Sequence, residues 1–290
     1  KSIVTPYYFQ QTTSTTIGAI NKLLGSSLTE EQAIAALARM DVDAKLTDGK
    51  IVVTPPAYRN DFLHEVDIIE DVMMGEELVN FKPEKPHDFT IGRLSKLTTF
   101  SRKAKTLMVG LGYQEMIFNY LGSKRDYIEK MNISDEKVIE ISNPMTENYQ
   151  FVRPSIIPSL LGAESGSGNA VYPHKIFEIG KIAYLDENEN TGTKTRHSMG
   201  FVTAVSDANF NNAASEVATL LHFLDHEYIV AESDDPRFIP GRQANVLMKK
   251  ADGTTEVVGI FGEIHPAVLE NWTITVPCFG GELDLESLLN

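Results

Sequence analysis

Two stretches near the start of the sequence, residues 17–24 and 30–40, carry apolar side chains at helical spacing. A threonine precedes each stretch, and its hydroxyl can accept a hydrogen bond from the first turn of a helix. Thr29 and Gln32 have the spacing of a capping box, in which each side chain bonds the backbone N–H of the other. Gly25 stands where the first helix would end, since glycine readily adopts the left-handed conformation of a helix cap. The pattern predicts two short helices.

Two short strands are expected next, at residues 42–46 and 50–54. Asp48-Gly49 between them favours a tight hairpin, because glycine accepts a positive φ. Pro55-Pro56 ends the second strand, since proline cannot donate a hydrogen bond to a sheet. Two helices and a hairpin together predict a small winged-helix-like module.

A third helical pattern lies in the stretch YRNDFLHEVDIIEDV, residues 58–72, which holds five carboxylates and one arginine. We expect this helix to begin near Asp61 or Phe62 and to end near Gly75. Its apolar stripe contains Phe62, Val66, Ile69 and Met73. Asp61 lies where the chain enters the helix, a position at which the helix dipole favours an acid.

Three acids, Asp67, Glu70 and Asp71, fall together on the opposite face of this helix. One interpretation is a solvated surface, which is usual for acids opposite an apolar stripe. Another is a metal site, because like charges four residues apart repel and no lysine lies nearby. A hard cation such as Mg²⁺ takes oxygen ligands, directly or through water, and a second protein could contribute to it. Arg59 could instead pair with one of the acids, and the residues alone leave these alternatives open.

The segment KPEKP, residues 82–86, is typical of a linker and divides the chain into residues 1–88 and 89–290. After it, residues 94–111 keep an apolar stripe at helical spacing. This is the one basic helix expected in an acidic chain, and its basic residues are Arg93, Lys96, Arg102, Lys103 and Lys105. The residues that follow it, 113–121, predict a strand.

The rest of the sequence predicts strands joined by hairpins, with helices grouped apart from them. The strands are expected at residues 137–141, 175–184, 198–205, 227–232, 243–249, 256–262 and 276–285. The helices are expected at residues 155–162, 211–224 and 266–271. Ala251-Asp252-Gly253 predicts a hairpin between two of the strands. Such an arrangement is typical of an antiparallel sheet, so the predicted fold class is α+β.

The composition limits the partners and surroundings of the protein. The 290 residues carry a net charge of −14, whereas a protein that grips nucleic acid by itself usually presents a basic face. If the protein binds RNA, a partner or another segment would therefore provide most of the contacts. Cys278 is the only cysteine, which excludes an internal disulfide and a cysteine zinc site and agrees with a cytoplasmic protein. The sequence has no apolar run long enough to span a membrane and no visible signal peptide, so we expect no membrane contact.

Motifs of nucleotide binding and nucleophilic catalysis are absent from the sequence. The glycine-rich residues 162–168 lack the lysine and hydroxyl residue of a P-loop and favour a flexible loop. Neither Gly-x-Ser-x-Gly nor His-Glu-x-x-His occurs, and the residues assemble no nucleophile, base and oxyanion site. His64 is expected at the surface or in a cap, and His265-Pro266 at the start of a helix. Arg242, after Pro240-Gly241, suits either a structural ion pair or a bound phosphate or carboxylate.

Five stretches, in this order, resemble the β subunit of phenylalanyl-tRNA synthetase in its archaeal/eukaryotic form. They are VTPPAYRNDFLHEVDIIEDV (53–72), ISNPMTENYQFVRPSIIPSLL (141–161), KIFEIGKIAY (175–184), PGRQANV (240–246) and GIFGEIHPAVLENW (259–272). The first is the most specific, and the resemblance covers most of residues 15–290. It implies a B-five-type module over residues 1–88, followed by a non-catalytic core over residues 89–290 that is shaped like a class II aminoacyl-tRNA synthetase.

The resemblance also implies an α₂β₂ assembly that uses ATP to join phenylalanine to tRNA(Phe). In that family the α subunit binds ATP and holds the active site, whereas the β core serves as an interface. The residues of this sequence agree with a non-catalytic core. No arginine directly precedes Phe177 in KIFEIG, where a catalytic core has its ATP-binding arginine strand. The segment around Arg242 also lacks the full glycine-rich class II pattern. The family's β subunit has an N-terminal editing part, so a chain that opens on Lys1-Ser2 is expected to be the later part of a longer one.

The same family places a Mg²⁺, shared with the α subunit, on carboxylates of the YRNDFLHEVDIIEDV stretch. The matching residues here are Asp61, Asp67, Glu70 and Asp71. Bacterial members commonly have glutamate at the position of Asp71, and the shorter side chain of aspartate reduces its reach. Because Mg²⁺ usually keeps several waters, we do not expect all four residues to coordinate it directly.

Two other functions stay open from the sequence. A free-standing non-catalytic paralogue would use the same fold as a binding module, and the absent N-terminal half motivates that alternative. An independent metal-dependent enzyme is disfavoured, because no nucleophile or base accompanies the acids. We further expect the isolated chain to self-associate or pack through residues 94–121, which match the class II interface element. The basic residues 93–105 are a candidate for contact with tRNA, although interface packing suits them better.

Overall fold

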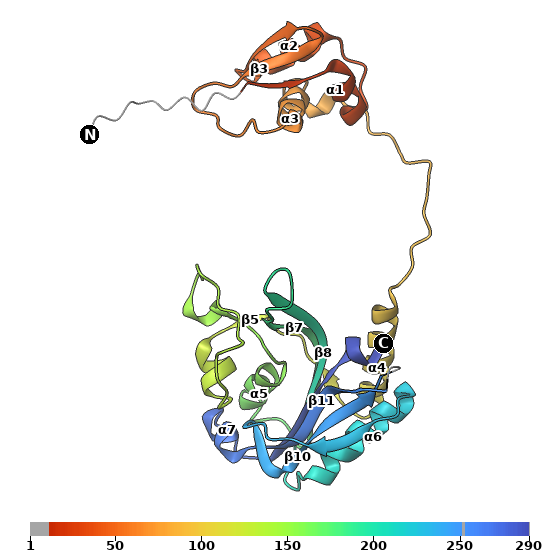
Figure 1. Cartoon of the computed structure of the whole chain (residues 1–290), viewed down its shortest axis with the longest axis vertical. Helices are drawn as coiled ribbons and strands as arrows, with labels where there is room; N and C mark the ends of the chain where they lie inside the picture. The colour runs from red at the N-terminus through yellow and green to blue at the C-terminus, as the bar shows by residue number, and fades with distance from the viewer. Residues whose placement is uncertain (1–11, 251–252, 290) are drawn as a thin grey trace, which may run out of the picture. The chain divides into compact units, whose positions relative to one another are not determined.

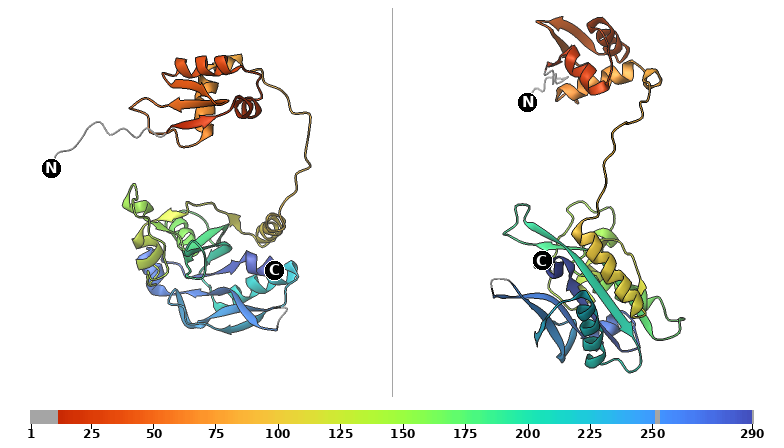
Figure 2. Two further views of the ribbon diagram at one scale, coloured as in Figure 1. Left: turned by 45° about the horizontal axis from the view of Figure 1, so that its top comes forward. Right: turned by 90° about the vertical axis from the view of Figure 1, so that its right-hand side faces the viewer.

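The computed structural model describes residues 12–250 and 253–289, and the chain forms two compact units. The first unit is Lys1–Ile91 and the second is Gly92–Asn290. The division lies shortly after the linker segment of residues 82–86. Figures 1 and 2 show the helices and strands of each unit.

From residue 12 on, where the structure describes it, the first unit is a three-stranded antiparallel sheet with three α-helices and one short 3₁₀ turn. Its elements are β1 (Thr13–Thr15), α1 (Ile17–Leu24), α2 (Glu30–Arg39), β2 (Asp43–Thr47), β3 (Lys50–Thr54), α3 (Glu65–Gly75) and η1 (Leu78–Asn80). β3 is the central strand, between β1 and β2. Fully buried side chains from the three helices and β3 form one core, including Ile20, Leu37, Ile51 and Ile68.

Local signals explain most of these elements. The hydroxyl of Thr16 accepts the backbone N–H of Ala19 at the start of α1, and Gly25 ends that helix with a φ of 63°. Both hydrogen bonds of the predicted capping box are formed between Thr29 and Gln32. The two helices and the hairpin of this unit are therefore confirmed.

The structure corrects the expected start of α3. The helix begins at Glu65, not near Asp61 or Phe62. The carboxylate of Asp67 accepts the backbone N–H groups of Leu63 and His64, so the residues before Glu65 form a cap rather than a helical turn.

The apolar stripe of α3 also differs from the expected one. Val66 is exposed, whereas Ile68, Ile69 and Val72 are buried. The buried face is rotated by about one residue from the expected one, because α3 packs on the core with the side that carries Ile68, Asp71 and Val72.

The second unit is built on a seven-stranded sheet in the order β4-β7-β8-β12-β11-β10-β9. Its strands are β4 (Gln114–Glu115), β7 (His174–Leu185), β8 (Thr193–Ala204), β9 (Ile229–Glu232), β10 (Phe238–Lys249), β11 (Thr255–Ile264) and β12 (Cys278–Asp284). A separate two-stranded pair joins β5 (Leu121–Gly122) to β6 (Phe151–Val152). Only the β4–β7 pairing is parallel, so the described sheets are antiparallel or mixed and the fold is α+β.

Helices cover both faces of the seven-stranded sheet. They are α4 (Lys96–Gly110), α5 (Ile157–Ser165), α6 (Phe210–Leu224), α7 (Pro266–Asn271) and α8 (Leu285–Leu289). Phe201 and Phe279 belong to the core beneath α4, α6 and α8. The neighbouring positions Val202 and Cys278 belong to the core beneath α5 and α7, as the alternation of side chains along a strand requires. Figure 2 shows α4 and α6 side by side along one face of the sheet.

Two expected strands of this unit are wrong. Residues 113–121 form only the two-residue strands β4 and the start of β5, because the chain leaves the sheet after Met116 and exposes Ile117 to solvent. Residues 137–141 form an isolated bridge from Glu140 to Phe151 instead of a strand.

The other expected strands and helices of the second unit are present, with ends shifted by a few residues. Of the expected Ala251-Asp252-Gly253 hairpin, Ala251 and Asp252 lie outside the described residues. The strands on either side of it pair from Lys249 to Thr255. Among the described helices none is both long and apolar enough to cross a membrane.

Candidate functional site

The acid-rich stretch of the first unit is organised around the guanidinium of Arg59. Its Nε lies 2.9 Å from Oδ1 of Asp61, and its Nη1 lies 2.9 Å from Oδ2 of Asp71. The guanidinium carbon also lies 4.6 Å from the centre of the Phe62 ring. Arg59 therefore pairs with two acids at once, which confirms the alternative in which this arginine neutralises part of the acid cluster.

The four predicted metal ligands lie in four different environments. Asp61 is exposed and bound to Arg59, whereas Asp71 is buried, with 5% of its surface accessible. Asp67 is half-buried and uses Oδ2 for two N–H groups at the start of α3. Glu70 is exposed. The interpretation of the three acids as one solvated face is wrong for Asp71, because this residue lies on the buried side of α3 and its carboxylate pairs with Arg59.

The electrostatics follow from these contacts. Hydrogen bonds from Arg59 hold the pKa of Asp61 below its ordinary value, and the two acids raise the pKa of Arg59 above its own. Within residues 12–250 and 253–289, no three acid, histidine or cysteine side chains converge closely enough to hold a metal ion. Arg59, Asp61 and Asp71 therefore form an ion-pair cluster, which we call the Arg59 clamp.

A second polar cluster lies within the core of the second unit, where Arg153 is fully buried. Its Nη1 and Nη2 donate to the two oxygens of Glu178 at 2.7 and 2.9 Å, and its Nε donates to the carbonyl of Lys181. Tyr120 lies against the guanidinium at 4.6 Å. A side chain at Gly180 would overlap Arg153, so the glycine of KIFEIG makes room for this arginine.

Glu282 on β12 is the centre of a separate group of buried polar contacts. It accepts hydrogen bonds from Ser155, from the backbone N–H of Ile156 and from Ser198. Arg237 donates to Ser155 from the opposite side. The polar side chains named in these two groups therefore have hydrogen-bond partners within the protein, as buried polar groups usually do.

The lone cysteine lies near a buried histidine–acid pair but is not set up as a nucleophile. His174 Nδ1 lies 2.9 Å from the carboxylate of Glu164, and its ring stacks on Tyr172. Burial, with a smaller contribution from Glu164, raises the pKa of the Cys278 thiol to about 12. The thiol therefore stays protonated near neutral pH, when only the thiolate would be reactive.

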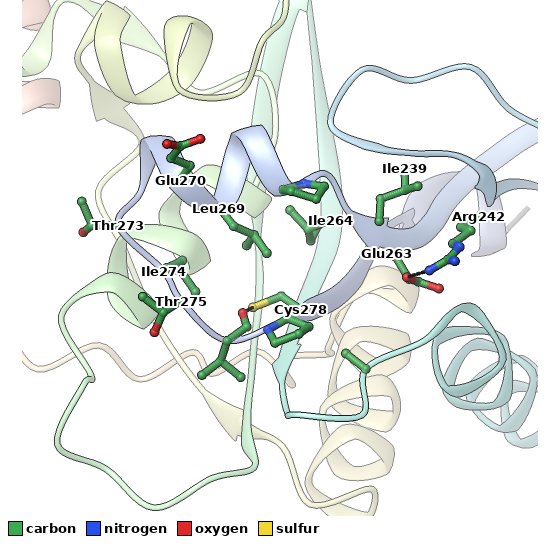
Figure 3. Close-up of a pocket in the computed structure, with 14 residues that line it drawn as sticks. Ile239, Arg242, Glu263, Ile264, Leu269, Glu270, Thr273, Ile274, Thr275 and Cys278 are labelled. Carbon is green, nitrogen blue, oxygen red and sulfur yellow. Dashed lines mark hydrogen bonds and ion pairs between the residues drawn. The ribbon is translucent and has the colours of Figure 1, made fainter.

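Arg242 lies at the end of a pocket of about 800 Å³ in the second unit (Figure 3). Its Nη1 donates to Glu263 at 2.8 Å, which confirms the ion-pair interpretation of this arginine. The ion pair is at one end of the pocket, and Glu270, Thr273 and Thr275 are at the other.

Sequence reasoning identified the residues of the acid cluster but missed the buried networks. Arg153, Glu178 and Glu282 lie far apart in the sequence, and nothing local distinguishes them from surface charges. Gly180 was the one available signal, because a glycine inside a strand often marks a close approach of another group.

Two family models match the two units. The model described as "tRNA synthetase B5 domain" matches residues 13–77. The model described as "Phenylalanyl tRNA synthetase beta chain CLM domain" matches residues 84–285.

Whole-chain relatives agree with these matches. A "Phenylalanine--tRNA ligase beta subunit" of Treponema pallidum subsp. pallidum is 50% identical over 289 residues, covering 100% of this chain and 47% of the relative. A protein of the same description from Borreliella burgdorferi is 47% identical over 290 residues, covering 100% of this chain and 50% of the relative. The chain spans about half the length of the curated relatives it matches.

The two-unit α+β fold and both family matches place the chain among the subunits of aminoacyl-tRNA synthetases. More particularly, it belongs to the phenylalanine–tRNA ligase beta-subunit family.

Proposed function

We propose that this chain is a structural part of a phenylalanine–tRNA ligase and assembles with the catalytic α subunit. The complex, an α₂β₂ tetramer in the cytoplasm, uses ATP to attach phenylalanine to tRNA(Phe). ATP binds in the α subunit, and tRNA(Phe) meets this chain through the complex. The family membership supports this role, and the closed polar network around Arg153 and Glu178 carries the inference that the chain itself is not catalytic.

The core of the second unit is proposed to be a class II synthetase-like fold that has lost its active site. Its support is the mainly antiparallel sheet with α4 along one face and α5 across the other. A class II site would require an open polar face on the sheet. Here Ile156, immediately before α5, and Leu160 of α5 pack against Gly200, where a side chain would overlap Ile156.

The α4–α6 face is the proposed surface for assembly. Val109 and Phe223 expose 59% and 57% of their surface on adjacent helices. Between these helices is a hollow of about 220 Å³, lined by Leu107, Leu111 and Leu220 among others. These exposed apolar side chains and the apolar lining of the hollow support a protein–protein contact at this place.

Mg²⁺ is proposed as a cofactor shared with the α subunit. The donor set has the right chemistry, because carboxylate oxygens are the ligands that Mg²⁺ takes. The present arrangement does not fit an ion, since Arg59 holds Asp61 and Asp71 while Asp67 caps α3. We therefore propose that the chain alone keeps Arg59 as the counter-cation and that the α subunit is needed for metal binding.

Glu70→Gln tests the metal proposal most cleanly, because Glu70 is exposed and its replacement keeps the size of the side chain. Calorimetry should show no Mg²⁺ binding to the chain alone and weakened Mg²⁺ binding to the variant complex. Glu84→Gln, at an exposed linker position, is the matched control. If Asp67→Asn, Glu70→Gln and Asp71→Asn together leave Mg²⁺ binding to the complex intact, the metal role is wrong.

The assembly role is tested by co-purification of the chain with a tagged α subunit. We expect a stable complex that Val109→Glu or Phe223→Glu weakens, because either change places a charge in an apolar contact. Val257→Glu is the control, since Val257 is similarly exposed on β11. A free-standing paralogue would show no complex, and a start codon immediately before the codon of Lys1 in the source gene would support that alternative.

A further inference from the structure

The pocket beside Arg242 has three features that the proposed assembly role does not require. The first is its form, an apolar trough with polar ends (Figure 3). Its apolar walls include Ile239, Ile264, Leu269 and Ile274. A volume of about 800 Å³ is within the range of pockets that hold small organic ligands.

The second feature is the spare hydrogen-bonding capacity of Arg242. Both oxygens of Glu263 are used, one by the N–H of Phe210 at 2.8 Å and the other by Arg242 at 2.8 Å. Only Nη1 of Arg242 has a partner within the described residues, and 60% of the side chain is exposed. Glu263 therefore holds the guanidinium in place, while its remaining N–H groups stay open to an anion.

The third feature is irregular backbone at both ends of the trough. Along β10, Phe238 pairs with Ile264 but Gln243 pairs with Gly262, so residues 239–242 bulge out of the sheet and carry Arg242 to the pocket. At the other end Thr273 has a φ of 59°, a conformation that β-branched residues rarely adopt. Bulges and strained residues of this kind gather at binding sites.

We infer that this pocket binds a small amphiphilic anion, with a carboxylate or phosphate head on Arg242 and an apolar body between Ile239, Ile264 and Leu269. Glu263 is a positioning residue, because it orients Arg242 and has no free oxygen of its own. The site lies entirely within the second unit and does not depend on the α subunit or on Mg²⁺.

The test uses the full chain with isoleucine δ1 methyl groups labelled with ¹³C and three probes. These are 4-phenylbutyrate, phenyl phosphate and the neutral 4-phenylbutanamide. We expect 4-phenylbutyrate to shift the methyl signals of Ile239, Ile264 and Ile274, while Ile20 and Ile51 of the first unit stay unchanged. The carboxylate should bind about tenfold more tightly than the amide, as a charge-assisted hydrogen bond predicts. Tighter binding of phenyl phosphate than of 4-phenylbutyrate would identify phosphate as the preferred head.

Variants test the contributions of the anionic head group and of the apolar body of the ligand separately. Arg242→Gln should remove the tenfold preference for the carboxylate, and Arg242→Lys should retain part of it because the charge remains without the planar fork. Thr275→Trp, at an exposed rim position, should fill the trough and abolish all three sets of shifts. Arg102→Gln, on the exposed face of α4, is the matched control. Absence of shifts with every probe at millimolar concentration, or an unchanged preference in Arg242→Gln, would overturn the proposal.

Discussion

At the scale of single residues, Arg59 connects separate parts of the acid-rich stretch. One guanidinium joins the exposed Asp61, the buried Asp71 and the ring of Phe62. The segment between β3 and α3 is thereby fixed to the helix, and an apparent excess of negative charge is partly neutralised within the chain. This explains how a carboxylate can lie inside the core of a small unit.

Replacing Arg59 should therefore destabilise the first unit. Arg59→Ala leaves the nearly buried Asp71 without its cation, which we expect to cost roughly 2–3 kcal/mol. Hydrogen exchange of peptides from α3 in increasing urea measures this change. Asp61→Asn is the control and should cost under about 1 kcal/mol, because 55% of that side chain is exposed. Equal effects of the two substitutions would contradict the clamp.

The same clamp gives the first unit an acid-dependent stability. Arg59 lowers the pKa of Asp61 in the folded protein. The Arg59–Asp61 ion pair therefore contributes its full stabilisation above the unfolded pKa of about 3.9, and this stabilisation is lost as the pH falls through the pKa of Asp61 in the folded protein. A ¹³C NMR titration of the Asp61 carboxyl should show a midpoint below that of an ordinary aspartate. In Arg59→Gln the midpoint should return to the ordinary value, and an identical midpoint in both proteins would rule out the explanation.

At the level of elements, the crossing of α2 and α3 depends on Gly75. A Cβ at this position would overlap the backbone carbonyl of Ala36. We expect Gly75→Ala to destabilise the first unit by about 1–3 kcal/mol through overpacking. Gly18→Ala is the matched control, because its Cβ would have no close neighbour and alanine favours a helix by about 0.5–1 kcal/mol. Thermal unfolding followed by circular dichroism should separate the two, and a stabilising Gly75→Ala would refute the close crossing.

The end of α7 carries a removable strain. Thr273 occupies the left-handed position after the helix, where glycine is usual. Thr273→Gly should stabilise the second unit by about 1 kcal/mol, since the unfavourable φ of the threonine is relieved. The fluorescence of Trp272, which is buried beside it, reports the unfolding. Thr275→Gly should give no gain, and equal stabilisation by both would argue against strain at Thr273.

Elements with strong local signals were predictable, whereas those made by distant partners were not. The capping box of α2 and the Asp48-Gly49 hairpin are visible within a few residues of sequence. β1 has no apolar alternation and becomes a strand only because it pairs with β3. The start of α3 was misplaced because Asp67 serves as a cap, which a count of apolar spacing does not reveal.

The residues of the candidate site were predictable from the sequence, but their environments were only partly so. The sequence singles out Asp61, Asp67, Glu70 and Asp71, and the pairing of Arg59 was among its alternatives. The burial of Asp71 depends on tertiary contacts and could not be seen in the sequence. Their role as metal ligands stays a prediction.

For the whole molecule, the exposed side chains of Val109 on α4 and Phe223 on α6 predict self-association when no partner is present. Sedimentation of the purified chain should show dimers or larger species that increase with concentration. Phe223→Glu should reduce them, whereas Val257→Glu on β11 should have a smaller effect. A clean monomer at high concentration would count against an interface on this face.

The central claim is that this chain supports an enzyme without performing its chemistry. Phenylalanine-dependent exchange between ATP and pyrophosphate measures the first step of that chemistry directly. We predict no exchange by this chain alone, and exchange together with aminoacylation of tRNA(Phe) when the α subunit is combined with the complete beta chain. Activation of phenylalanine by this chain in the absence of the α subunit would contradict the claim.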